Sequence, residues 1–330
     1  MREQITLAIE TSCDETAVAV LNGREIVASE VASQIDLHAI TGGVVPEVAS
    51  RNHLRALRPV LERALAQAHI TIREVDAYAA TRGPGLATSL MIGCSVAKGL
   101  ALASGRPFIG INHLEGHLLS PFYGNFVKPS VGLIVSGGHT LLINVDGVGR
   151  YRSVGGTVDD AAGEAFDKVG KLLGLPYPGG PHVNRLAATG DPTKYEFPRS
   201  MMESGDYNFS FSGLKTSVRY LLPKLQEYRL EDICASFQEA VVDVLVSKTV
   251  KAVAETGHST VAVSGGVSCN TRLRERFEAE CAVLGLEVLF AEPRLCTDNA
   301  AMIGFAAALK LARGERSPMT TDIDPNLRLV

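Results

Sequence analysis

The strongest constraint on this sequence is a repeated pattern of short apolar strands that each end in a polar or glycine-rich turn. The turns lie at residues 10–16 (ETSCDET), 136–140 (SGGHT) and 264–270 (SGGVSCN). In the first two copies a second apolar strand follows, which predicts a β-hairpin with a polar tip. The third turn runs into a helix, so backbone N–H groups point at whatever lies above it. Together the turns predict one binding site for a phosphate-containing, nucleotide-like ligand.

Helices and short strands alternate along the whole chain, which indicates the α/β class. Helical spacing of apolar residues is found at 47–68, 89–103, 159–173, 230–255 and 297–312. The two hairpins predict a duplicated core with one hairpin in each lobe and the ligand in a cleft between the lobes. We expect a first lobe of residues 1–110, with a C-terminal helix from about 300–330 packing back on it. The second lobe would be 111–299, with a loop-rich insertion at 176–211.

Composition limits the classes of partner. The 330 residues are 46% hydrophobic, enough for substantial cores in two domains. The net charge of -4 gives no general attraction to nucleic acid, so RNA would need a local basic patch or a second protein. Clusters of basic residues on a surface are, however, commonly solvated faces with no nucleic-acid partner. The candidate basic residues are Arg51, Arg55 and Arg58 on one helix, and Lys215, Arg219 and Lys224 on another segment.

The cysteines and the N-terminal segment bear on the compartment. The six cysteines are far apart and include no C-x-x-C pair, which favours reduced thiols. The first ten residues lack the apolar core of a signal peptide. No apolar run approaches the roughly 20 residues of a membrane span. We therefore expect a cytoplasmic protein with no membrane partner.

A pair of histidines indicates a metal site. His113 and His117 are four residues apart, and on a helix they would share one face, a spacing that suits two imidazoles on one metal ion. Alternatively, one would cap the helix and the other would form hydrogen bonds in the core. Asp298 is the best candidate for a third ligand, although an aspartate before an apolar helix is commonly its N-cap.

The residue between the histidines argues against a peptidase. Glu115 lies two positions from each histidine, roughly 200° around the helix, whereas zinc peptidases with the H-E-x-x-H motif place their glutamate beside the metal. A metallopeptidase therefore stays as the less favoured alternative.

An acidic segment offers groups for a hydroxyl-rich ligand. Asp160, Glu164 and Asp167 would share one helical face, either as solvated acids or as hydrogen-bond partners of a ribose. Asp167 is the stronger candidate for ribose binding because the loop 177–181 (YPGGP) follows it.

Taken together, these segments resemble the TsaD family of tRNA threonylcarbamoyladenosine transferases, within the actin-like, sugar-kinase and heat-shock ATPase (ASKHA) superfamily. The resemblance implies a two-lobed actin-like ATPase fold. A kinase or nucleotide-sensing module of the same superfamily is an alternative, but such kinases do not need a paired-histidine site. The matching stretches follow one another in family order: 10–16, 42–47, 112–117, 136–140, 159–168, 177–181, 209–215, 264–270 and 296–302.

The resemblance also implies a reaction and a set of site residues. Threonylcarbamoyl-AMP would give its threonylcarbamoyl group to the exocyclic amine of adenosine 37, beside the anticodon of tRNAs reading ANN codons, and release AMP. From its place at the tip of the first hairpin, and not from the resemblance, Asp14 is our candidate for positioning or deprotonating the amine; alternatively, it only forms an Asx turn. TsaB and TsaE would be the protein partners. The implied metal ligands, for Fe²⁺ or Zn²⁺, are His113, His117 and Asp298, and the implied contacts of the adenylate are Ile134, Val135, Ser136, Gly137, Gly138, Asp167, Gly180 and Asn270.

Overall fold

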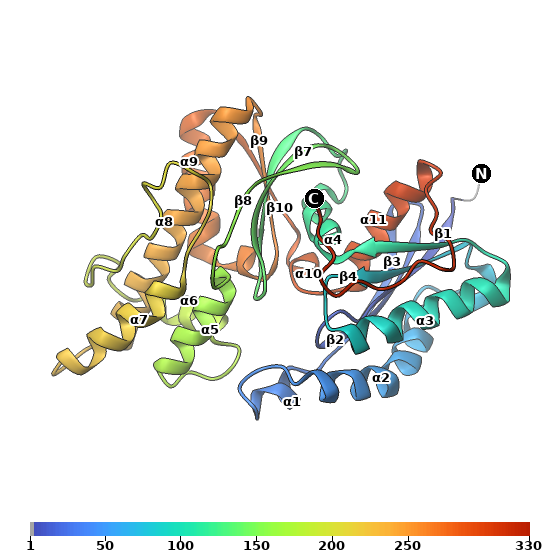
Figure 1. Ribbon diagram of the computed structural model, residues 1–330, viewed down its shortest axis with the longest axis horizontal. Helices are drawn as coiled ribbons and strands as arrows, with labels where there is room; N and C mark the ends of the chain where they lie inside the picture. Colours follow the sequence, from blue (N-terminus) through green and yellow to red (C-terminus); the bar gives the residue numbers. More distant parts are fainter. Residues whose placement is uncertain (1–2) are drawn as a thin grey trace. The chain divides into compact units, whose positions relative to one another are not determined.

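The computed structural model describes residues 3–330, and the chain divides into two compact units (Figure 1). The first contains the chain up to Val127 together with Thr297–Val330, and the second is Lys128–Cys296. The first unit therefore extends beyond the boundary expected near residue 110, and it includes both histidines of the predicted metal site.

The first unit is built on a five-stranded sheet with the order β3-β2-β1-β4-β5. Strands β1 and β2 form the predicted antiparallel hairpin, β3 continues it, and β4 and β5 run parallel to β1. The bounds are β1 Ile5–Glu10, β2 Glu15–Asn22, β3 Glu25–Ser33, β4 Ala77–Gly83 and β5 Phe108–Asn112.

Helices cover both faces of this sheet (Figure 1). Alternate residues of β1 point to opposite faces. Leu7 and Ile9 belong to the apolar cluster formed with α2 (Pro46–Gln67) and α3 (Ala87–Ser104). On the other face lie α4 (His113–Leu119) and α11 (Ala300–Ala312), and Gly304 of α11 comes so close that a Cβ there would lie 3.2 Å from the Cβ of Ala8. The last helix of the chain therefore completes the first unit.

Helix α3 is long and apolar enough, by length and composition alone, to cross a membrane. In the structure its residues Cys94, Ala97 and Ala101 are buried in the core of the first unit. The small residues of this helix allow it to pack closely against β4 and β1.

The second unit repeats the topology of the first. Its sheet has the order β10-β9-β6-β7-β8, in which β6, β7 and β8 are antiparallel neighbours and β9 and β10 run parallel to β6. Strand β6 therefore takes the place that β1 has in the first sheet, which confirms the predicted duplicated α/β core. The bounds are β6 Ser130–Val135, β7 Thr140–Gly147, β8 Arg150–Gly156, β9 Thr260–Ser264 and β10 Glu287–Phe290.

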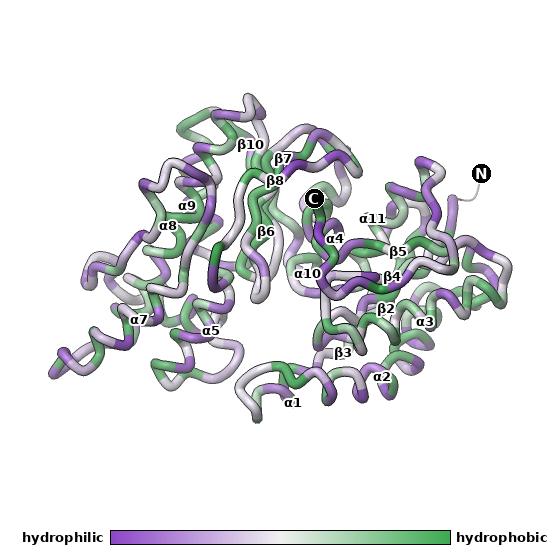
Figure 2. Tube along the Cα trace, in the orientation of Figure 1, coloured by the Kyte–Doolittle hydropathy of each residue, from purple (hydrophilic) through white to green (hydrophobic). Residues whose placement is uncertain are grey.

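Helices of the second unit pack on this sheet, and the central strands of both sheets carry the most apolar residues (Figure 2). Helix α8 packs on β6 and β9, and α9 packs on β10. The remaining elements of the chain are short. The helix bounds are α1 Ile35–Ala39, α5 Ala162–Leu172, α6 Gly179–Ala187, α7 Ser212–Leu221, α8 Leu230–Thr256, α9 Thr271–Leu284 and α10 Pro293–Cys296, and the 3₁₀ turns are 72–74, 120–122, 222–224 and 266–269.

The segment expected to be a loop-rich insertion contains a helix. Helix α6 buries Val183 and Ala187 in the core of the second unit. Its helical character is hidden in the sequence because Pro178, Gly179 and Pro181 gather at its start. Proline is tolerated there, since the first N–H groups of a helix have no partner within it.

Helix α5 begins later than its sequence pattern suggests, and it docks on the second turn. The backbone N–H of Gly163 donates to the carbonyl of Ser136 at 3.2 Å, and that of Ala162 donates to the Thr140 hydroxyl at 2.9 Å. A Cβ at Gly163 would lie 2.6 Å from the Ser136 oxygen and 2.8 Å from the Cα of Gly137. The close approach therefore requires glycine.

We predict that Gly163→Ala lowers the free energy of unfolding by about 1–3 kcal/mol, because backbone atoms must move to accept the methyl group. In the control Gly213→Ala, the nearest neighbour of the new Cβ is the Ser200 hydroxyl at 3.6 Å, an ordinary contact. Urea denaturation of both variants tests this prediction. Equal stabilities of the two variants would contradict it.

Candidate functional site

Parallel strands bring the site residues of the first unit to one edge of its sheet. Glu10 is the last residue of β1, Thr81 lies near the end of β4, and Asn112 ends β5. The carboxyl ends of parallel strands meet at the same edge, which is where open α/β sheets bind their ligands. Residues far apart in the sequence therefore meet here.

Helix α4 begins at this edge and carries both histidines. The Asn112 side chain accepts a hydrogen bond from the backbone N–H of Leu114 at 2.8 Å, so Asn112 is the N-cap and the histidines are not. His113 and His117 are both buried, and their ring centroids are 4.8 Å apart. The pair is thus placed on one helical face, as predicted.

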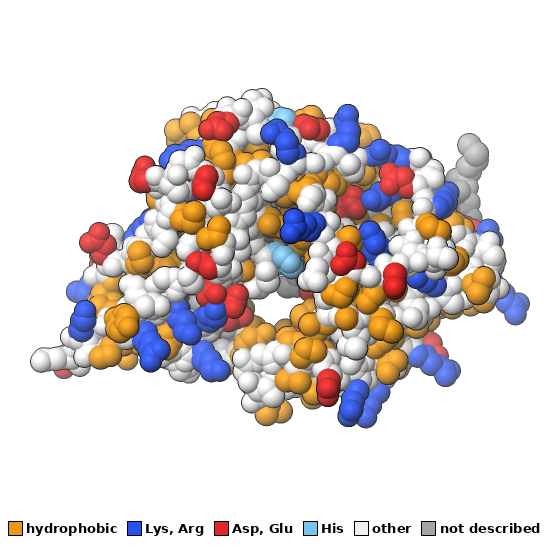
Figure 3. Space-filling model, in the orientation of Figure 1, with side chains coloured by type: hydrophobic (Ala, Val, Ile, Leu, Met, Phe, Trp, Pro, Cys, Tyr) orange, Lys and Arg blue, Asp and Glu red, His pale blue; other side chains and the backbone are white. Residues whose placement is uncertain are grey.

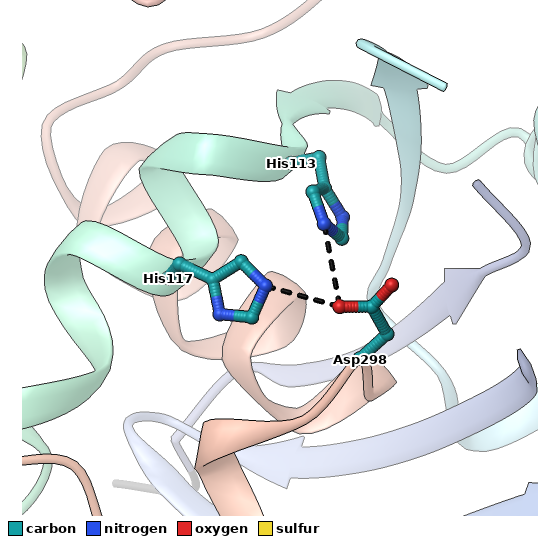
Figure 4. Close-up of side chains that lie close together, drawn as sticks. All are labelled: His113, His117 and Asp298. Carbon is teal, nitrogen blue, oxygen red and sulfur yellow. Dashed lines mark hydrogen bonds and ion pairs between the residues drawn. The ribbon is translucent and has the colours of Figure 1, made fainter. Parts of the chain in front are cut away.

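Asp298 reaches both imidazoles (Figure 4). Its Oδ1 atom lies 3.4 Å from Nε2 of His113 and 3.0 Å from Nε2 of His117. The N-cap of α11 is the next residue, Asn299, whose side chain accepts from the Met302 N–H at 2.8 Å. Asp298 is therefore free of the capping role that is common for an aspartate at this position.

Charges within the cluster shift the pKa values of Asp298 and His113 in opposite directions. Burial alone would raise the pKa of Asp298, but the charge of His113 and hydrogen bonds from both histidines hold that pKa well below its usual range. Burial alone would lower the pKa of His113, but the charges of Asp298 and Glu10 raise it well above its ordinary value. A positive charge is therefore favoured at this position.

The donor set fits a divalent transition metal. One nitrogen of each histidine and one oxygen of Asp298 all lie within 4.8 Å of one another. Two ligands bound at about 2.0–2.1 Å in tetrahedral geometry would be about 3.3 Å apart, close to the separations of Asp298 from the two imidazoles. Two histidines and one carboxylate suit Zn²⁺ or non-haem Fe²⁺ and leave positions open for another ligand.

Behind His113 lies a second carboxylate, which the sequence analysis placed in the first turn without assigning it a role. Glu10 is fully buried, and its Oε2 atom lies 3.1 Å from Nδ1 of His113. The Thr81 hydroxyl and the Ser12 backbone N–H also donate to this carboxylate. Burial alone would raise the pKa of Glu10, but the charge of His113 and its hydrogen bond outweigh that effect and lower it.

The first turn places Asp14 among other acids. Asp14 is buried, and its carboxylate forms hydrogen bonds with the side chains of Cys13 and Glu15. Burial, together with the charges of Asp298 and Asp14, raises the pKa of Glu15 to about 9. His53 also contacts this turn, because its Nε2 atom lies 3.0 Å from the Cys13 carbonyl oxygen.

Glu115 lies apart from the metal-ligand cluster. It is buried, and its carboxylate pairs with Lys310 of α11 at 3.1 Å. A carboxylate held in this ion pair is not in place to activate water beside the histidines. The geometry therefore agrees with the sequence argument against a peptidase.

The second unit has two glycine-rich turns of its own. The turn after β6 is closed by a hydrogen bond from the Ser136 N–H to the His139 carbonyl at 2.8 Å. A Cβ at Gly137 or Gly138 would meet no heavy atom within 4 Å, so the space beside both residues is open. In the turn after β9, Gly265 has a φ of 90° and lies against the Val135 carbonyl, which only glycine permits.

The structure shows what the other predicted adenylate contacts do in the fold. The side chains of Ile134 and Val135 are buried in the second unit. Asp167 accepts from the N–H groups of Gly179 and Gly180 at 2.7 and 3.2 Å, and it thereby holds the start of α6. Burial raises the pKa of Asp167.

Asn270 also has a defined role within the second unit. It caps α9 by accepting from the Leu273 N–H at 3.0 Å. Its amide group donates to Gln238 at 2.6 Å. Contact with an adenylate stays a prediction for Asn270 and for the other residues of this set.

Comparison with known proteins gives the family. The family model "TsaD: tRNA N6-adenosine threonylcarbamoyltransferase" matches residues 25–305. A tRNA N6-adenosine threonylcarbamoyltransferase of Geobacter sp. (strain M21) is 51% identical over 326 residues, which are 97% of this chain and 95% of the relative. The chain belongs to the TsaD family. Its class is therefore that of a transferase, and the metallopeptidase alternative finds no support in these matches.

Other relatives of this TsaD-family chain agree. The enzyme of the same name from Thermotoga neapolitana is 49% identical over 324 residues, covering 97% of this chain and 98% of the relative. The solved structure of full-length HypF in its phosphate- and nucleotide-bound form matches 95% of this chain and 47% of that protein, with a TM-score of 0.66 and 14% identity. Component A of the (R)-2-hydroxyglutaryl-CoA dehydratase from Acidaminococcus fermentans matches 94% of this chain and 100% of that chain, with a TM-score of 0.59 and 16% identity. These structural likenesses support the actin-like fold class.

We predict that Asp167→Ala lowers the free energy of unfolding by about 1–2 kcal/mol, because two N–H groups at the start of α6 lose their acceptor. Asp167→Asn keeps an acceptor oxygen and should lose less. The control Glu164→Ala removes only a partly exposed ion pair with Lys168, worth less than about 1 kcal/mol. Urea denaturation compares the three, and equal losses for Asp167→Ala and Glu164→Ala would show that Asp167 does not hold α6.

Proposed function

We propose that this chain transfers the threonylcarbamoyl group from threonylcarbamoyl-AMP to the exocyclic amine of adenosine 37 in tRNA, in the cytoplasm. The amine nitrogen attacks the carbonyl carbon, the bond from that carbon to the phosphate oxygen breaks, and AMP leaves as the amine loses a proton. The observation that carries the proposal is the His113–His117–Asp298 cluster in a chain of the TsaD family. No covalent enzyme intermediate is needed.

The three clustered residues would hold one divalent ion, Fe²⁺ or Zn²⁺. The ion would act as a Lewis acid that polarises the carbonyl of the transferred group. Both imidazoles come from one helical turn, and Asp298 lies directly before the capped start of α11.

The leaving phosphate needs hydrogen-bond donors that are in place before the reaction. The backbone N–H groups of Gly137 and Gly138 are suited to this task, because the open space beside both residues allows a ligand to approach the backbone. Asp167, Gly180 and Asn270 would contact the ribose and base.

Asp14 is the proposed group that positions or deprotonates the attacking amine. Its carboxylate is buried beside Glu15, whose pKa is raised by burial and by the charges of Asp298 and Asp14. A carboxylate is a group that can accept the proton which the amine loses.

Recognition of tRNA would need basic side chains on the surface. Figure 3 shows basic residues over α2 and α7, among acidic and apolar ones. Arg51 and Arg55 are exposed on α2 and Arg219 on α7, whereas Arg58 pairs with Glu62. Because these groups are few, we include partner proteins of the TsaB and TsaE type in the proposal.

We predict that the protein, threonylcarbamoyl-AMP and unmodified tRNA, with partner proteins of these two types, yield threonylcarbamoyladenosine. The modified nucleoside is measured by mass spectrometry after digestion of the tRNA. His117→Ala should lose both bound metal and activity, whereas the exposed variant Asp36→Asn should keep both. Absence of the nucleoside in every mixture, with and without partners, would refute the proposed function.

We predict that Asp14→Asn lowers the single-turnover rate of transfer by about 10²–10⁴-fold, since an amide can hold the amine but cannot accept its proton. The metal content should stay that of the unmodified protein, which separates this effect from damage to the cluster. A rate within threefold of the unmodified protein would assign Asp14 a structural role only.

A further inference from the structure

The two histidines of the cluster are held in different ways on the side away from Asp298. Nδ1 of His113 lies 3.1 Å from the Glu10 carboxylate and 3.2 Å from the Ser12 hydroxyl. Nδ1 of His117 is buried and has no hydrogen-bond partner among the described residues. Only one of the two rings is therefore fixed by a second polar contact.

The Glu10 carboxylate is itself locked in place. It is fully buried at the end of β1, and it accepts from the Thr81 hydroxyl and from the Ser12 N–H. These two donors come from the neighbouring strand β4 and from the first turn. The carboxylate therefore cannot turn away from His113 without leaving buried donors unpaired, which is costly.

A carboxylate offers only acceptors, so its contact with Nδ1 requires the proton of a neutral imidazole to sit on that nitrogen. The lone pair is then on Nε2, the atom that faces Asp298. Metal-ligating histidines commonly donate their other N–H in this way, and the partner fixes the tautomer and raises the basicity of the ligand.

We propose that Glu10 is a positioning residue that orients His113 and sets its tautomer for metal binding through Nε2. This inference rests on the proposed function, because it assigns the His113–His117–Asp298 cluster to a metal ion. Glu10 acts through His113 and contacts neither the ion nor the substrate. His117, whose Nδ1 has no such partner within residues 3–330, would supply the more weakly oriented of the two imidazole ligands.

The test is the affinity of the full-length, metal-free protein for Zn²⁺, measured by competition with a chromophoric chelator. Glu10→Gln keeps the shape of the side chain but can donate where the carboxylate only accepts, and we expect affinity to fall about 10–100-fold. The matched control is Glu115→Gln, which removes the same charge from a buried carboxylate on α4 that pairs with Lys310 instead of a histidine. That variant should bind Zn²⁺ within threefold of the unmodified protein.

A second measurement uses the unmodified protein and does not depend on the folding of a variant. In the Zn²⁺-loaded protein with ¹⁵N-labelled histidine, His113 should show a protonated Nδ1 and a metal-bound Nε2, with the signals assigned by comparison with His113→Gln. Equal Zn²⁺ affinities for Glu10→Gln and Glu115→Gln, or binding of the ion through Nδ1 of His113, would overturn the role of Glu10 alone. Absence of Zn²⁺ binding by the unmodified protein would overturn both this inference and the metal-dependent part of the proposed function.

Discussion

The contact on which the first unit's chemistry depends is that of one oxygen of Asp298 with two imidazole nitrogens of α4. A buried carboxylate is tolerated only where positive charge or hydrogen-bond donors balance it. The histidines provide this balance for Asp298, and Glu10 provides a second negative charge behind His113. Strand β1, helix α4 and the start of α11 are therefore tied together by charge as well as by apolar packing.

The two sheets share one topology but present different groups at the same position. In the first unit β1 ends in Glu10, whose side chain contacts His113. In the second unit β6 is followed by a turn in which Gly137 and Gly138 leave open space beside the backbone. The duplicated frame thus presents a clustered carboxylate side chain in one unit and open backbone in the other, and the difference comes from the few residues at the end of a central strand.

Much of the fold could be predicted because its signals are local. Alternating apolar residues predicted the two hairpins, and helical spacing predicted α2 and α8 almost to their ends. Helix α6 was missed because its proline and glycine residues look like a loop, although they stand where a helix accepts them. The local signal was misleading there because the core, and not the sequence pattern, stabilises the helix.

The candidate metal ligands could be named from the sequence, but their proximity could not be predicted from it. The His113 and His117 pair is visible as a four-residue interval, but no local pattern joins Asp298 to it, and the competing capping role is excluded only once Asn299 is seen in place. The contact of Glu10 with His113 could not be predicted from the sequence, because it depends on the pairing of β1 with β4 and on the position of β5 beside β4. Contacts between strands that are distant in sequence produce no regular interval between residues from which they could be predicted.

The first unit is discontinuous in sequence, and this affects how it folds during synthesis on the ribosome. His117 and Asp298 are separated by 181 positions, and all of the second unit lies between them. During synthesis from the N-terminus, strands β1–β5 emerge first, and one face of their sheet stays uncovered until α11 has been synthesised. The first unit is thus the last to be completed. A chain that ends early would contain both histidines of the cluster but not Asp298.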